Sequence, residues 1–120
     1  MNARIKKKWV AALKSGEYEQ GFDALCTTNA QNDSFCPLGV LCELHAQETG
    51  EAWEPGRSHR PHRLRYYGAA SALPHTVCDW ADLPSNPGLI YNGFVYTVST
   101  LNDEARLSFR QLADIIQRQL

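Results

Sequence analysis

The residues of this 120-residue chain that could do chemistry are four cysteines and four histidines. Cys36 stands just before Pro37, where the sequence predicts the start of a helix, and a helix N-terminus lowers the pKa of a thiol. Cys36 is therefore the one cysteine with a local argument for reactivity. With a histidine such as His75 as base, it could form a nucleophilic dyad, so these two residues are the catalytic candidates.

The same residues are poorly spaced for a metal ion. Nine residues separate Cys26 from Cys36, and five separate Cys36 from Cys42, so the chain lacks the C-x-x-C pair that places two thiolates on one turn. We therefore expect no metal and no cofactor. The first residues do not form a secretory signal, so we expect a cytoplasmic protein whose thiols are reduced and buried as small apolar side chains.

Other catalytic patterns are missing from the sequence. It has no Gly-rich phosphate loop, no G-x-S-x-G elbow and no H-E-x-x-H pair. Asn102 and Asp103 are interpreted as a turn that hydrogen-bonds its own backbone, and Tyr18, Gln20 and Gly21 as a short strand and turn. These observations favour a non-enzymatic protein.

Charge is segregated along the chain, although the formal net charge is only −1. A basic opening is followed by the stretch 15–55, which has eight acidic residues and no Lys or Arg. Four arginines then fall within nine residues and are followed by tyrosines. Such a cluster can bind an acidic protein or a phosphate backbone. The predicted partner-binding residues are Arg57, Arg60, Arg63, Arg65 and Tyr66.

Apolar spacing predicts an α+β fold in a single domain, 1–120. Helices are expected at 3–14, 36–47, 74–81 and 109–119. Asn92-Gly93 between two β-prone runs predicts a hairpin at 89–98, with 63–67 as a candidate third strand and 26–34 as a loop. The expected core is Trp9, Leu13, Leu38, Leu41, Val77, Trp80, Phe109, Leu112 and Ile116. No apolar run reaches the ~20 residues of a membrane-spanning helix, so no membrane association is expected.

Four segments carry a resemblance to a family of small uncharacterised proteins of bacteriophages, prophages and bacteria. They are KWVAALKSGEYEQG at 8–21, FCPLGVLCELHAQETG at 35–50, LPHTVCDWADL at 73–83 and LNDEARLSFRQLADIIQRQL at 101–120. The family more often has two adjacent cysteines where this chain has Cys36-Pro37, which weakens the idea of an essential cysteine pair. The resemblance implies a phage-type accessory protein in the host cytoplasm and no particular reaction.

Three functions remain open from the sequence. We favour a non-enzymatic accessory protein that binds a host or phage protein as an inhibitor or adaptor. The alternatives are a nucleic-acid-binding protein that uses the arginine cluster, and a cysteine-dependent enzyme that uses Cys36.

Overall fold

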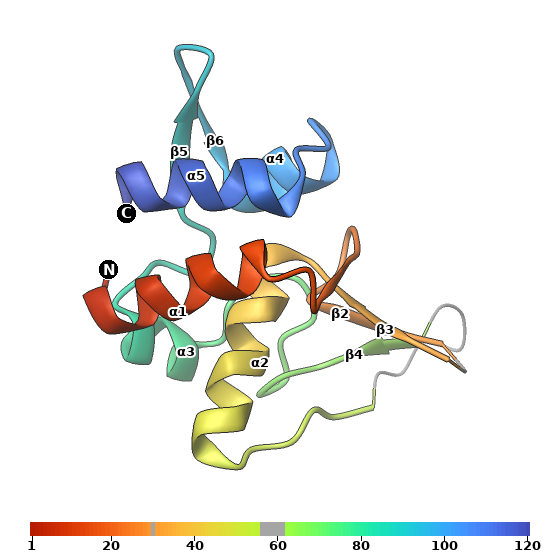
Figure 1. Cartoon of the computed structure of the whole chain (residues 1–120). Helices are drawn as coiled ribbons and strands as arrows, with labels where there is room; N and C mark the ends of the chain where they lie inside the picture. The colour runs from red at the N-terminus through yellow and green to blue at the C-terminus, as the bar shows by residue number, and fades with distance from the viewer. Residues whose placement is uncertain (30, 56–61) are drawn as a thin grey trace.

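The structure of the chain is a computed structural model that describes residues 1–29, 31–55 and 62–120 (Figure 1). It confirms the α+β fold: the described residues form five helices and two small sheets. Arg57, His59 and Arg60 lie outside the described residues, so two of the predicted partner-binding arginines have no structural account. No helix in the described ranges is both long and apolar enough to cross a bilayer.

The four predicted helices are present with nearly the predicted bounds. They are α1 (Ala3–Lys14), α2 (Pro37–Thr49), α3 (His75–Ala81) and α5 (Phe109–Gln119). Asn2 caps α1 by accepting a hydrogen bond from the Ile5 amide at 3.0 Å, and Ser108 forms a capping box with Gln111 at the start of α5. These local bonds explain why the two helices begin where the sequence predicts.

One short helix, α4 (Val98–Asp103), is not among the helices predicted from the sequence. Its residues are mostly β-branched or polar, so their intrinsic helix propensity is low. The Thr97 hydroxyl accepts a hydrogen bond from the Thr100 amide at 3.2 Å and starts the helix. Burial of Val98 and Leu101 then holds it against the core.

The first sheet corrects the prediction for residues 26–34. The expected loop at 26–34 is wrong, because β2 (Cys26–Thr28) and β3 (Asp33–Phe35) form an antiparallel pair there. Only Cys26 and Phe35 are buried in these two strands. The other strand residues are exposed or partly buried, which explains why the segment is polar. β1 (Glu19–Gln20) pairs with β3, and β4 (His62–Leu64) pairs with β2.

The second sheet consists of β5 (Gly88–Tyr91) and β6 (Phe94–Thr97) alone. The predicted hairpin at 89–98 is therefore confirmed in position. The candidate third strand at 63–67 does not join it, because β4 lies in the other sheet. The hairpin is stabilised by helix packing and not by a further strand among the described residues.

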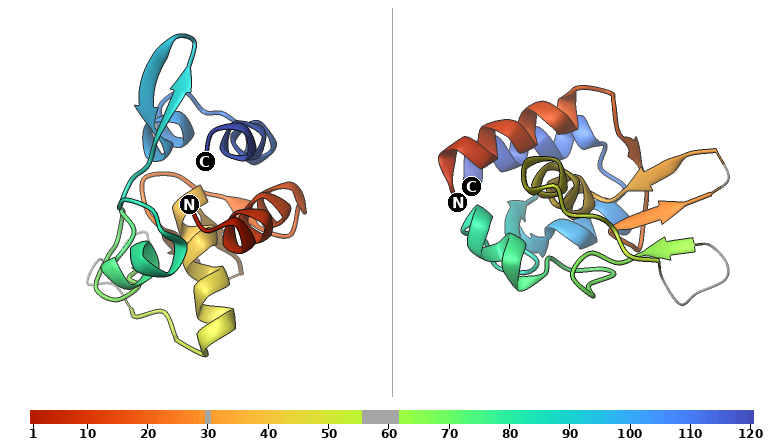
Figure 2. Two further views of the ribbon diagram at one scale, coloured as in Figure 1. Left: turned by 90° about the vertical axis from the view of Figure 1, so that its left-hand side faces the viewer. Right: turned by 90° about the horizontal axis from the view of Figure 1, so that it is seen from below.

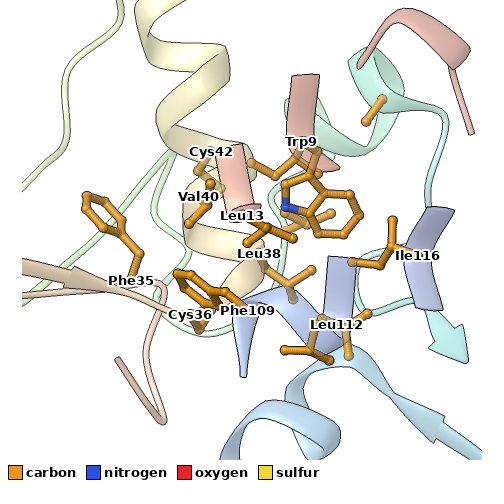
Figure 3. Packing of buried hydrophobic residues seen from close by; sticks show 14 of the residues in the cluster. Trp9, Leu13, Phe35, Cys36, Leu38, Val40, Cys42, Phe109, Leu112 and Ile116 are labelled. Atoms are coloured by element: carbon orange, nitrogen blue, oxygen red, sulfur yellow. The ribbon is translucent and has the colours of Figure 1, made fainter. Parts of the chain in front are cut away.

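The core lies where α1, α2 and α5 meet (Figure 3). The Trp9 indole is fully buried, and its Nε1 donates a hydrogen bond to the Pro37 carbonyl oxygen at 2.8 Å, which ties α1 to the start of α2. Eight of the nine expected core residues are buried. Trp80 is the exception: it is half-buried, and its Nε1 donates to the Glu48 carboxylate at 2.6 Å, so it lies at the rim of the core.

The first turns of α2 press against the chain before β2. A Cβ added at Gly39 would lie 1.7 Å from the Leu25 carbonyl oxygen, which is far inside any allowed contact. The contact is with backbone, so no side-chain rotation can relieve it. Gly39 is therefore required here by packing, despite the poor helix propensity of glycine.

We predict that Gly39→Ala destabilises the protein by about 2 kcal/mol or more, because α2 must move away from Leu25. Helix propensity alone predicts the opposite sign, a gain of about 1 kcal/mol. Urea unfolding followed by tryptophan fluorescence measures the difference. An alanine variant as stable as the parent would contradict the close packing.

Candidate protein-binding surface

The β5–β6 hairpin projects from the rest of the molecule (Figures 1 and 2). Its two-residue turn has positive φ at both positions, 51° at Asn92 and 83° at Gly93, as a type I′ turn requires. Tyr91 pairs with Phe94, and Ile90 pairs with Val95. The turn predicted from Asn-Gly therefore sets the register of the whole hairpin.

Large apolar side chains of this hairpin are exposed. The exposed fraction is 59% for Ile90, 66% for Phe94 and 73% for Val95. Across the described residues, Tyr67 is the one large hydrophobic side chain outside the hairpin that is also exposed, with an exposed fraction of 45%. Clustered exposed apolar groups of this kind mark interaction sites.

The two faces of the hairpin differ in chemistry. Because directly opposed residues share a face, Tyr91, Phe94 and Tyr96 lie together, and the ring centroids of Tyr91 and Phe94 are each 6.5 Å from that of Tyr96. The opposite face carries Ile90 and Val95. One face is thus aromatic and the other aliphatic.

Contacts at its base hold the hairpin in a defined position. Leu89 is buried in the core. The Gln119 side chain of α5 accepts a hydrogen bond from the Ile90 amide at 2.7 Å and donates one to the Ile90 carbonyl oxygen at 2.8 Å. The Val98 amide also donates to the Pro87 carbonyl oxygen at 2.9 Å. The hairpin is fixed to the body at both strands while its tip remains free.

This surface was not predicted, although the sequence contains a sign of it. Residues 84–102 include no charged residue and no histidine. A stretch of that length without charge is ordinary when it is buried, but here it includes the exposed apolar side chains of the hairpin. The uncharged stretch 84–102 was therefore as informative about a binding surface as the cluster of arginines at 57–65.

Cys36 does not have the reactivity that its position predicted. Its side chain is buried in the core, and burial raises the pKa of the thiol to about 12, which outweighs the lowering effect of the amides at the start of α2 (Figure 3). His75 is exposed on α3, where it lines a shallow pocket of about 320 Å³ with Cys78 and Asp79. Cys36 does not line that pocket, and its burial and high thiol pKa disfavour the candidate dyad with His75.

The pKa values of the other three cysteines are raised as well. All four are free thiols. Burial raises the pKa of Cys26 to about 12, and it raises the pKa values of Cys42 and Cys78 above the ordinary thiol range. Within the described ranges, no three side chains of His, Cys, Asp or Glu come together in a way that could hold a metal ion.

The arginine cluster is only partly described. Arg63 and Arg65 are exposed at β4 and just after it, and Arg65 donates to the Gly68 carbonyl oxygen at 3.1 Å. Tyr66, predicted to contact a partner, is instead fully buried, with its hydroxyl 2.6 Å from His45 Nδ1. Residues along this extended segment alternate between solvent and core, so the neighbour of an exposed arginine points inward.

The polar residues near Gly21 form a structural network. Asn102 is fully buried, accepts a hydrogen bond from Gln20 Nε2 at 2.7 Å and donates to the Gly21 carbonyl oxygen at 2.9 Å. Gln20 also donates to the Leu107 carbonyl oxygen at 2.8 Å. The interpretation of Asn102 as a self-bonded turn is wrong: it lies in α4 and ties that helix to the chain after β1.

A family model described as a domain of unknown function, DUF8296, matches residues 1–120. The chain belongs to this family. No curated protein and no solved structure matches the chain. The DUF8296 assignment covers the whole chain but supplies no activity, so a function for this member has to be argued from its own surfaces.

We predict that alkylation of the folded protein by iodoacetamide at neutral pH modifies Cys78 first. Cys78 is half-buried, whereas Cys26, Cys36 and Cys42 are buried and react only when the structure opens. Peptide mass mapping over time measures the order, with the urea-unfolded protein as the control in which all four react. Faster labelling of Cys36 than of Cys78 in the folded protein would contradict this prediction and support a dyad of Cys36 and His75.

We predict that the unfolding free energy falls as the pH drops from about 7.5 to about 5.5 and that His45→Gln weakens this dependence. Burial lowers the pKa of His45 in the folded protein, although Glu48 and Glu51 act in the opposite direction. Below pH 6.5 the unfolded chain therefore binds a proton that the folded chain does not, and acid favours unfolding. Equal pH slopes for the two proteins in urea unfolding would contradict this.

Proposed function

We propose that this member of the DUF8296 family is a non-enzymatic binding protein whose β5–β6 hairpin docks on an apolar surface of another protein. The observation that carries the proposal is the exposure of Ile90, Phe94 and Val95 on a segment without charge. An exposed aromatic residue typically contributes most to affinity when it enters a pocket of the partner.

The attachment of the hairpin supports a docking role. Leu89 and the Gln119 amide hold its base, so the aromatic face is presented in one orientation before binding. A preorganised element loses little conformational entropy on association, and more of the contact energy then appears as affinity. A flexible loop with the same residues would bind more weakly.

The cellular setting of the proposal comes from the resemblance to phage and prophage proteins. In that setting the partner is a host or phage protein in the cytoplasm, and the chain acts as an inhibitor or adaptor. Stoichiometric binding requires no catalytic group, which agrees with the high thiol pKa of Cys36. Strand β4 lies apart from the hairpin (Figure 1). Arg63 in β4 and Arg65 just after it are a second candidate surface.

We predict that a photo-crosslinking amino acid at Val95 gives a discrete adduct in bacterial cells that express the protein, because Val95 lies on the docking element. The same probe at Glu104, which is exposed at the C-terminal end of α4 and lies outside the hairpin in sequence, is the matched control. Excess unmodified protein should abolish the adduct, and excess Phe94→Ser should not. An adduct that forms equally at both positions, or one that Phe94→Ser removes as well, would refute the hairpin as the docking site.

Two further measurements separate the possible outcomes. Phe94→Ser should change the unfolding free energy by about 1 kcal/mol or less, because the ring is mostly exposed. Apolar docking should also survive an increase in salt from about 0.1 M to about 0.5 M, whereas binding through Arg63 and Arg65 to phosphate should weaken steeply. A steep salt dependence would therefore favour the nucleic-acid alternative.

A further inference from the structure

The two outer edges of the hairpin differ. On β5, the outward-facing amide and carbonyl of Ile90 are both occupied by the Gln119 side chain. Because Val95 pairs directly with Ile90, its amide and carbonyl also face outward, but on the opposite edge. No described residue hydrogen-bonds to the outward side of β6 at Val95. The hairpin thus has one closed edge and one open edge.

The open edge has none of the usual protection against strand pairing. Exposed edges are commonly blocked by charged side chains, proline or a bulge. β6 reads Phe-Val-Tyr-Thr and has no charge, no proline and a regular register with β5. The nearest charged residue along the chain is Asp103, at the end of α4.

The edge is complementary to a second copy of itself. If two β6 strands pair antiparallel about a two-fold axis at Val95, the outward amide of each Val95 donates to the outward carbonyl of the other. This register places Phe94 of one copy opposite Tyr96 of the second copy. Both residues lie on the aromatic face, where close cross-strand aromatic pairs are favourable.

We propose that two copies of this chain associate through the β6 edge and form a continuous four-stranded antiparallel sheet. Like charges do not oppose each other across this contact, because residues 84–102 carry none. The four-residue edge of β6 buries less than the roughly 800 Å² per partner of a standard stable interface. The dimer therefore forms in the micromolar-to-millimolar range and depends on concentration.

The proposed dimer leaves the aromatic face of each hairpin accessible to another protein. Pairing at the edge occupies backbone groups, and it brings the aromatic faces of two hairpins side by side. The inference rests on the proposed function only in that both need an accessible hairpin. Loss of the dimer with retention of the Val95 crosslink to another protein would end this inference alone.

Sedimentation equilibrium from about 10 µM to about 1 mM tests the proposal with the protein by itself. The weight-average mass should rise from 13.5 kDa toward twice that value as the concentration increases. Val95→Lys should weaken association by about fivefold or more, because it puts two like charges directly opposite each other. A mass of one chain at every concentration would overturn the proposal.

Ile90→Lys is the matched control, because Ile90 is the direct partner of Val95, lies on the same face and is similarly exposed. The added charge is equal, but it lies over the edge that Gln119 closes. It should leave association within about twofold of the parent. Equal loss in the two variants, or no loss in Val95→Lys, would show that the β6 edge is not the contact.

Discussion

The fold depends on the burial of the first half of α2. Residues 37–42 are all buried, and Gly39 lies so close to the Leu25 carbonyl that only a glycine fits. Trp9 adds a hydrogen bond from α1 to the Pro37 carbonyl. A helix enclosed in this way brings α1, α4 and the first sheet together, and the rest of the chain is arranged around it.

The same burial opposes the thiol activation expected at the start of α2. A helix N-terminus lowers a thiol pKa, but removal of the thiolate from water raises it by more, so Cys36 has a pKa of about 12. The residue that seemed most reactive in the sequence is therefore part of the packing. The polar cluster of Gln20 and Asn102 has a comparable structural role, because its hydrogen bonds are made to other parts of the chain.

Local physics made much of the fold predictable. Asn2 and Ser108 caps, the apolar stripes of α1 and α5, and the Asn92-Gly93 turn are short-range features that depend little on the rest of the chain. The first sheet was missed because its strands are two or three residues long and mostly polar, so pairing between distant segments decides them. Tyr66 was misplaced for the same reason, since only the tertiary structure shows which side of its segment faces His45.

The hairpin surface could be predicted only in part. Its turn and strands follow from residues 89–98, but its exposure depends on how few of its side chains the core includes. Once α1, α2 and α5 have packed, only Leu89 of the hairpin's large apolar side chains is needed in the core, and Phe94 and Val95 remain outside. The spacing of apolar residues in the sequence shows which residues are apolar. It does not show which of them are buried in the core.

Backbone hydrogen exchange of a dilute sample, in which the chain is monomeric, tests most directly that the hairpin is anchored on one side and open on the other. The exchange rates of the Ile90 and Val95 amides should differ, although both side chains are apolar and exposed. The Ile90 amide should exchange slowly because Gln119 accepts its hydrogen bond, and the Val95 amide should exchange fast, as an unpaired amide does. Equal protection of both amides, or fast exchange of Ile90, would contradict the account.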